Sequence, residues 1–396
     1  MKKSHIANNT HDLQHADDLF IPFNKPFIAG KELYYIAQAV MGLHLSGDGQ
    51  YTKLCHEWLE EHLGCCKAFL THSCTGALEM AAILCDIQPG DEVIMPSFTF
   101  VSTANAFVLR GAVPVFIDIR PDTLNINELL IETAITPRTR AIVPVHYAGV
   151  GCAMDEIMGI AQEHDLTVIE DAAQALLSTY KGRFLGTIGH MGCLSFHETK
   201  NIISGEGGAL LINTPQLIER AEIIREKGTN RSKFFREEVD KYTWVDIGSS
   251  FLPSELVGAF LYAQLEQSEN IIKARCHILQ RYFELLQPLE EKGLIRLPFV
   301  ENVNTCNGHM FYVITGSLDE RTRLIAYLKA NGIGAVFHYV PLHSSPAGQK
   351  YGRVTGEIKV TEDLSDRLLR LPMFYEMDDT DVERIVNNIS AFYEKR

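Results

Sequence analysis

The sequence predicts an α/β protein in which a large domain holds a mostly parallel sheet and a smaller C-terminal domain is of the α+β type. Between about residues 64 and 212, short β-rich apolar runs alternate with helical stretches, the pattern of a sheet covered by helices. After residue 260 this alternation ends. A chain of 396 residues is also too long for one compact core, because domains hold roughly 100 to 200 residues. We therefore expect a polar N-terminal arm at 1–20, a large domain at 21–262 and a small domain at 263–396.

Seven strands are expected in the large domain. They are the runs AFLT, EVIMP, VPVFID, AIVPV, TVIED, CLSFH and ALLIN, and between them residues 75–87 and 155–165 carry apolar residues at helical spacing. In the small domain we expect helices at 269–289, 321–332 and 379–395, and strands at 309–316 and 334–342. Because the loops that follow parallel strands meet at one edge of a sheet, a ligand is expected there.

Charge and cysteine content narrow the class of protein. The formal net charge of −14 disfavours binding to nucleic acid or to an anionic membrane. The first twenty residues have no apolar core of a signal peptide, and no apolar run approaches the roughly 20 residues of a membrane span. Nine scattered cysteines, an odd number, favour reduced thiols. We expect a cytoplasmic protein without disulfides.

Lys200 and Asp171 form the strongest chemical signal. Lys200 follows the strand run CLSFH and precedes the Gly-rich GEGG, and Asp171 ends the run TVIED. Pyridoxal 5′-phosphate (PLP) requires a lysine that binds its aldehyde as a Schiff base and a carboxylate that keeps its pyridine nitrogen protonated. Taken singly, a loop lysine is usually a solvated charge, and Asp171 could cap a helix over AAQALLSTY. Together they predict a PLP site.

A phosphate needs its own cradle, and the run THSCTGALEM offers one. Ser73, Cys74 and Thr75 directly precede an expected helix, whose first amides are free to bind an anion. An ordinary helix cap is the alternative interpretation. Ser195 adds a hydroxyl close to Lys200. In PSFTFVSTANAF, Phe98 or Phe100 could stack on a flat ring, although a lone Phe is more often part of a core.

Two further runs have the composition of a ligand site without its spacing. Residues 55–66, CHEWLEEHLGCC, lack both HExxH and paired CxxC, so we expect no metal site. Residues 149–154, GVGCAM, hold too few glycines for a dinucleotide fingerprint.

The runs SCTGALEMAAILCDIQPGDEVIMPSFTFVSTANAFVLRGA, VIEDAAQ, SFHETKN, GEGGA, REKGTNRS and KYTWVDIGSS together resemble the DegT/DnrJ/EryC1/StrS group of PLP-dependent sugar aminotransferases. The resemblance extends from IPFNKPFIAG at 21–30 to the C-terminus. It implies the PLP-dependent transferase fold type I, as in aspartate aminotransferase, and a homodimer in which each subunit completes the other's active site.

Roles for individual residues follow from the resemblance. Lys200 corresponds to the Schiff-base lysine and Asp171 to the partner of the pyridine nitrogen. Gln174 would contact the ring hydroxyl, Phe100 would stack on the ring, and the phosphate would be held by Cys74, Thr75 and Ser195. Many members place an Asn on the phosphate across the dimer interface, where this chain has Ser250 in the run GSS. The expected nucleotide-sugar contacts are His146, Tyr147, Arg231, Tyr339 and His343.

The resemblance also implies a reaction. L-Glutamate would aminate dTDP-4-keto-6-deoxy-D-glucose, giving dTDP-4-amino-4,6-dideoxy-D-galactose, an amino sugar of enterobacterial common antigen, and 2-oxoglutarate. The gluco epimer is an alternative product. Another alternative is a PLP-dependent sugar dehydratase, which has His in place of the Schiff-base lysine, so Lys200 argues against it. A non-catalytic regulatory member is the third.

Overall fold

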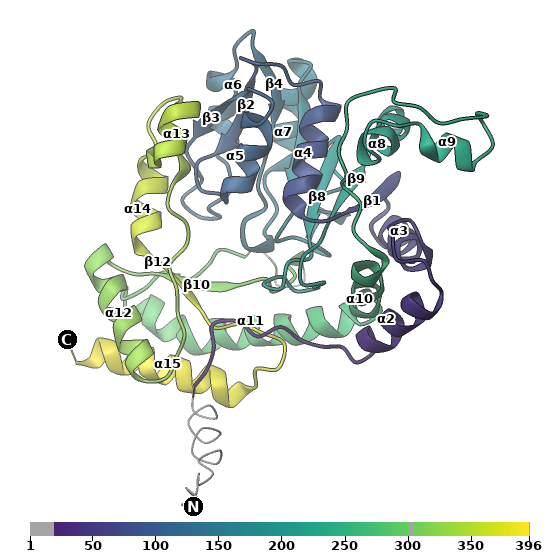
Figure 1. The fold of residues 1–396 in the computed structure, drawn as a ribbon. Helices are drawn as coiled ribbons and strands as arrows, with labels where there is room; N and C mark the ends of the chain where they lie inside the picture. The colour runs from purple at the N-terminus through teal and green to yellow at the C-terminus, as the bar shows by residue number, and fades with distance from the viewer. Residues whose placement is uncertain (1–19, 301, 303–304, 396) are drawn as a thin grey trace, which may run out of the picture.

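The computed structural model describes residues 20–300, 302 and 305–395, so the expected N-terminal arm lies, up to residue 19, outside the described residues. The ribbon has a large sheet with helices on both faces and a smaller body of helices beneath it (Figure 1). None of the helices in the described ranges combines the length and the apolar character needed to cross a bilayer.

The large sheet has eight strands in the order β1-β9-β8-β5-β4-β2-β3-β11. All neighbours are parallel except β9, which is antiparallel to both β1 and β8. All seven expected strands form, with ends shifted by a few residues. The strands are β1 (Lys67–Thr71), β2 (Glu92–Pro96), β3 (Val113–Ile117), β4 (Thr139–Ile142), β5 (Thr167–Asp171), β8 (Met191–Ser195), β9 (Gly208–Ile212) and β11 (Arg353–Val354).

Alternate residues of these strands supply two separate cores. Ile94, Ile142 and Val168 face one helical layer, whereas their neighbours Val93 and Ile169 face the other, as the period of two in a strand requires. The first layer includes α3 (Gln50–Leu63), α7 (Met154–Glu163) and α10 (Glu255–Leu265), and the second includes α4 (Cys74–Leu84), α5 (Val101–Val108) and α8 (Ile218–Arg225). The remaining elements of this region are α2 (Glu32–Met41), α6 (Ile131–Ala134), α9 (Arg231–Phe235) and the hairpin β6 (Thr179–Tyr180) with β7 (Arg183–Phe184).

The small domain packs helices on a two-stranded antiparallel sheet of β10 and β12. Its elements are α11 (Ser268–Glu291), β10 (Phe311–Ile314), α12 (Leu318–Ala330), α13 (Pro346–Tyr351), α14 (Lys359–Arg367), β12 (Leu368–Leu371) and α15 (Asp379–Glu394). The three expected helices and the first expected strand are present.

The strand expected at 334–342 is wrong. Only Val336 forms a bridge, to Arg370, while all four residues of β12 pair with β10. Pro341 cannot donate to a strand ladder, and the apolar run instead delivers His338 and Tyr339 to the cavity described below.

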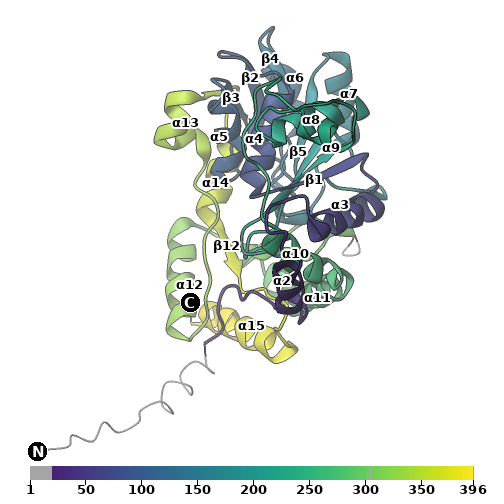
Figure 2. The same cartoon turned by 45° about the vertical axis from the view of Figure 1, so that its right-hand side comes forward.

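Segments from each side of the expected domain boundary, at residues 262 and 263, pack in the other domain. Ile21 bridges Ile333 of the small domain, with Ile21 N–H donating to Gly332 O at 2.8 Å. Conversely, β11 extends the large sheet beside β3, and α13 lies next to that edge in both views (Figure 2). The two bodies are therefore joined at two places remote from residue 262.

Candidate active site

A cavity of about 600 Å³ lies between the large sheet and the small domain and contains both Lys200 and Asp171. β5 and β8 are parallel neighbours, with Asp171 opposite Cys193. The end of β5 and the loop after β8 therefore open at the same sheet edge, as expected for this type of sheet. The small domain contributes His309, His338 and Arg370 to the opposite wall.

The carboxylate of Asp171 is buried and held from two sides. Thr103 Oγ1 donates to Asp171 Oδ2 at 2.7 Å, and the backbone N–H of Ala173 donates to Asp171 Oδ1 at 3.2 Å. Thr99 Oγ1 lies 2.8 Å from Thr103 Oγ1. No α-helix follows Asp171, because residues 172–178 form turns. Asp171 is thus not a helix cap, and its carboxylate is fixed in the cavity wall.

Lys200 lies in the loop between β8 and β9, where its backbone N–H closes a tight turn by donating to His197 O at 2.9 Å. Burial is the largest cause that lowers the pKa of Lys200; the charge of Arg370 lowers it further, and the negative charge of Asp171 opposes the shift. A lysine with a lowered pKa carries more of the neutral amine, the form that attacks carbonyls and accepts protons.

The N-terminus of α4 forms the predicted anion cradle and is capped as well. Ser73 Oγ accepts from Gly76 N–H at 3.0 Å, so Ser73 caps the helix while the amides of Cys74 and Thr75 donate to no described residue. A Cβ on Gly208 would overlap the backbone of Ser73 and Cys74, so β9 approaches this cradle closely only because position 208 is glycine. Burial raises the pKa of the Cys74 thiol well above its usual range, which keeps it uncharged beside an anion.

Hydroxyl and aromatic groups complete the site. Thr75 Oγ1 lies 2.8 Å from Ser102 Oγ, and Ser195 lines the same cavity. Phe100 is 56% exposed and lines the cavity, whereas Phe98 is buried against Tyr147. Phe100 is therefore the ring available for stacking.

Gln174 is fixed by hydrogen bonds to two different segments. Its Oε1 accepts from Ala148 N–H at 2.7 Å, and its Nε2 donates to Tyr339 OH at 3.0 Å. Both Gln174 and Tyr339 line the cavity.

Three expected substrate residues do not line this cavity. His146 is fully buried, its Nδ1 accepting from Cys152 N–H and its Nε2 donating to Glu170 at 2.8 Å. Tyr147 is also fully buried, with its OH 3.0 Å from His338 Nδ1. His343 lies 2.7 Å from Ser97 Oγ through its Nδ1. These side chains support the walls around the site, and His146 has no ring nitrogen free for a substrate.

Arg231 and Ser250 line a different cavity, of about 660 Å³. It also contains His44, Asp48 and Lys53. The single chain therefore does not bring Arg231 or Ser250 to Lys200.

Several cavity residues were not found from the sequence. Ser102 and Thr103 lie in the run PSFTFVSTANAF, in which only Phe98 and Phe100 were considered as ligand contacts. Their two hydroxyls were the signal that could have identified them. His309, His338 and Arg370 come from the small domain, and no spacing relates them to Lys200.

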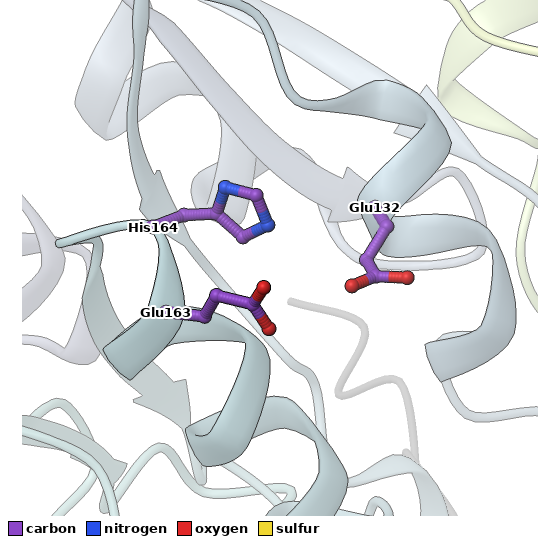
Figure 3. Close-up of side chains that lie close together, drawn as sticks. All are labelled: Glu132, Glu163 and His164. Carbon is purple, nitrogen blue, oxygen red and sulfur yellow. The ribbon is translucent and has the colours of Figure 1, made fainter.

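Among the described residues, one group of side chains has the proximity of metal ligands: Glu132, Glu163 and His164. They project toward a common point from α6 and the C-terminal end of α7 (Figure 3), and their ligand atoms lie within 4.8 Å of one another. All three are exposed, and exposed acidic groups commonly gather without an ion. The group is remote in sequence from residues 55–66 and shares no residue with either cavity.

The donors of the first cavity match the three functional groups of PLP. The free amides of Cys74 and Thr75 with the hydroxyl of Ser195 suit the phosphate, Asp171 suits a protonated pyridine nitrogen, and Lys200 suits the aldehyde.

Comparison with known proteins identifies the family. The model of the DegT/DnrJ/EryC1/StrS aminotransferase family matches residues 27–390. The uncharacterized protein MJ1066 of Methanocaldococcus jannaschii is 35% identical over 378 residues, which cover 93% of this chain and 97% of that protein. The spore coat polysaccharide biosynthesis protein SpsC of Bacillus subtilis is 33% identical over 381 residues, covering 93% and 96%.

Solved structures agree on the fold. DesV of S. venezuelae, in complex with a ketimine intermediate, is 30% identical with a TM-score of 0.85 and covers 95% of this chain and 99% of its own. The PLP form of the putative sugar aminotransferase Spr1654 from Streptococcus pneumoniae is 25% identical with a TM-score of 0.86 at the same coverage. The fold is therefore the PLP-dependent transferase fold type I, and the chain belongs to the DegT/DnrJ/EryC1/StrS aminotransferase family, with PLP as its cofactor.

Proposed function

We propose that this protein transfers the amino group of L-glutamate to a nucleotide-linked 4-keto-6-deoxy sugar. The proposed acceptor is dTDP-4-keto-6-deoxy-D-glucose, and the products are dTDP-4-amino-4,6-dideoxy-D-galactose and 2-oxoglutarate, a step in the synthesis of enterobacterial common antigen. The observation that carries the proposal is the shared cavity of Lys200, Asp171 and the α4 cradle. The sugar itself is inferred from the motif resemblance and from relatives whose names refer to sugars and polysaccharides.

Lys200, Asp171 and the α4 cradle each have a defined task in this reaction. When bound, PLP supplies an electron sink for the charge left on the reacting carbon. Lys200 Nζ removes the proton from the donor's α-carbon in the first half-reaction and delivers a proton to the sugar's C4 in the second. Asp171, held by Thr103 and by Ala173 N–H, keeps a negative charge beside the ring nitrogen. The cradle at Cys74 and Thr75 anchors the phosphate.

We also propose a homodimer with shared active sites. The segment 231–247 projects from the large domain around α9 (Figure 1), and it exposes Phe235 (65%) and Trp244 (79%) together with Phe234, Tyr242, Val245 and Ile247. A cluster of exposed apolar side chains of this kind marks an interaction surface. A second subunit packed on it would bring Arg231 and Ser250 to the neighbour's Lys200 cavity.

Incubation with dTDP-4-keto-6-deoxyglucose and L-glutamate tests the proposal, with NMR of the product and assay of 2-oxoglutarate. An axial amine at C4 is expected. An equatorial amine would establish the gluco alternative, and loss of a hydroxyl without nitrogen incorporation would indicate a dehydratase. A protein that releases no 2-oxoglutarate from glutamate with any 4-keto sugar would contradict the proposal.

A further inference from the structure

Two cysteine thiols from separate segments of the small domain lie side by side. Cys276 is on α11, and Cys306 is in the segment that leads to β10. Cys276 Sγ donates to Cys306 O at 3.3 Å, and the two thiols are also in hydrogen-bonding contact with each other. Cys276 is partly exposed, whereas Cys306 is buried. The pair therefore meets the first requirement for a disulfide, which is that the two side chains do not point apart.

The backbones that carry the two thiols are also in contact. A Cβ on Gly308 would lie 2.8 Å from the carbonyl carbon of Arg275 and 3.0 Å from Cys276 N. The 306–309 segment therefore rests directly on α11. The buried guanidinium of Arg275 donates to Gly308 O at 3.0 Å and to His309 O at 2.8 Å, which holds the segment in place. Cysteines on distant backbones cannot be joined without a large movement of the chain, and here no such movement is needed.

Cys306 is the thiol of the pair that loses its proton first. Contact with Cys276 lowers the pKa of the Cys306 thiol, burial opposes this shift, and a hydrogen bond from Gly308 N–H adds to it. The pKa of the Cys276 thiol is raised, first by the contact with Cys306 and then by burial. Because the thiolate is the reactive form of cysteine, the nucleophile of the pair is Cys306. Burial raises the pKa of five further thiols, those of Cys55, Cys65, Cys74, Cys85 and Cys193.

We propose that Cys276 and Cys306 form a redox-responsive pair that hydrogen peroxide converts into a disulfide. The Cys306 thiolate attacks one peroxide oxygen, the O–O bond breaks, and Cys306 becomes a sulfenic acid while the other oxygen leaves as water. The sulfur of Cys276 then attacks the sulfenic sulfur, so that the S–S bond forms, the S–O bond breaks and a second water leaves with the Cys276 proton. Two thiols and one peroxide give one disulfide and two waters, and an excess of a small thiol reverses the change by thiol–disulfide exchange.

The 306–309 segment connects the thiol pair to the Lys200 cavity. Asn201, the residue after Lys200, is buried, and its Nδ2 donates to Asn307 O at 2.7 Å. Its Oδ1 lies 3.1 Å from His309 Nδ1, and His309 lines the cavity. A disulfide draws the two sulfurs from hydrogen-bonding distance to about 2.0 Å, which pulls this segment toward α11. The redox state of the pair therefore sets the position of the groups that hold the residue next to Lys200.

The first test follows the two thiols directly in the full-length, PLP-loaded protein treated with hydrogen peroxide. Peptide mass spectrometry without reductant is expected to find residues 276 and 306 in one cross-linked pair that has lost two hydrogens, and dithiothreitol should separate it. In Cys276→Ala the sulfenic acid has no partner thiol, so dimedone, which labels sulfenic acids, should mark Cys306. A wild-type protein that forms no 276–306 cross-link would overturn the proposal, as would a Cys306 that dimedone leaves unlabelled in Cys276→Ala.

The second test reads the effect on the site from the donor half-reaction with L-glutamate, followed by cofactor absorbance. Oxidation is expected to slow the wild type at least roughly tenfold, within the hundredfold that a misplacement of about 1 Å can cost, and dithiothreitol should restore the rate. Cys276→Ala and Cys306→Ser should resist the treatment. The matched control is Cys66→Ala, at an exposed cysteine whose Sγ donates to Asn213 O, and it should respond as wild type does.

Two results of the second test would contradict the link between the thiol pair and the cavity. One is a cross-linked protein that reacts at the unoxidised rate. The other is an equal loss of rate in Cys276→Ala, which would point to Cys74 in the cavity wall. If Cys306→Ser fails to fold, Cys276→Ala decides, because alanine suits a helix. A wild type that does not react with glutamate would refute the proposed donor while leaving the cross-link measurement valid.

Discussion

The amine of Lys200 is held where burial and the charge of Arg370 favour its neutral form, while the negative charge of Asp171 favours its charged form. Lys200→Ala is expected to keep PLP through the cradle and Asp171 but to lose the proton carrier. Turnover should fall at least about 100-fold, the lower end of general acid–base catalysis. Steady-state assay with glutamate and the sugar substrate measures this loss.

Borohydride reduction followed by peptide mass spectrometry should attach the cofactor to Lys200 in the wild type and to no lysine in Lys200→Ala. Lys181→Ala, at an exposed lysine paired with Asp155, is the control and should behave as wild type. Activity retained in Lys200→Ala would remove Lys200 from the mechanism.

The hydroxyl of Thr103 positions Asp171. Thr103→Val keeps the shape of the buried side chain and removes the donor to Asp171 Oδ2, and a hydrogen bond to a charged group contributes about 1.5–3 kcal/mol. We expect kcat to fall about tenfold or more with little change in either KM, as measured in both half-reactions. Thr103→Ser should stay near wild type, and an equal loss in both variants would indicate packing instead of the hydroxyl.

Among individual site residues, those that directly follow strand ends could be identified from the sequence. Lys200, Asp171 and the α4 cradle were predictable because strand, turn and helix signals stand next to them in the chain. The hydroxyl of Thr103 lies in a run that was considered only for its phenylalanines, whereas Arg370 reaches the same cavity through tertiary contacts that no local pattern indicated. His146 is the opposite case. Its position in the family resemblance predicted a substrate contact, but both of its ring nitrogens already form hydrogen bonds, with Glu170 and with Cys152 N–H.

Among the elements, β11 is attached to the large sheet by more than its two residues. Glu92, fully buried on β2, accepts from Arg353 Nε at 3.0 Å and Arg353 Nη2 at 2.7 Å. Thr136 and Arg138 also donate to Glu92. The hydrogen bonds from Arg353, more than any other cause, lower the pKa of Glu92 to about 2.

Because the folded pKa of Glu92 lies below its unfolded value of about 4.3, its contribution to stability is complete above that pH and is lost as pH falls toward 2. Arg353→Met should lower the free energy of unfolding by up to roughly 3 kcal/mol near neutral pH. The difference from wild type should shrink below about pH 4, as measured by urea unfolding across pH. A difference that stays constant with pH would contradict the Glu92 pairing.

The elements themselves were largely predictable from apolar spacing, with ends shifted by a few residues. The exception, 334–342, has the composition of a strand, but within it only Val336 forms a bridge, to Arg370 of β12, and Pro341 cannot donate to a ladder. Whether such a run pairs along its whole length depends on the assembled fold and is not encoded in the run alone.

For the whole molecule, the proposed homodimer predicts complementation between inactive variants. Lys200→Ala and Arg231→Ala lie in different cavities of one chain, so a mixed dimer would contain one site with both residues intact. Mixing the two after subunit exchange is expected to restore part of the wild-type activity. Lys200→Ala mixed with Asp171→Asn is the control, because both changes affect the same cavity, and no recovery is expected. Equal behaviour of the two mixtures would contradict shared sites.

The pairing of β11 with β3 also has a consequence for synthesis of the chain. Residues 353–354 cover the edge of β3, more than two hundred residues earlier in the sequence. At roughly 5–20 residues per second, the ribosome delivers β11 on the order of 10–50 s after β3. An uncovered strand edge is a template for pairing with other chains, so the nascent protein passes through an interval in which its sheet is built but unprotected.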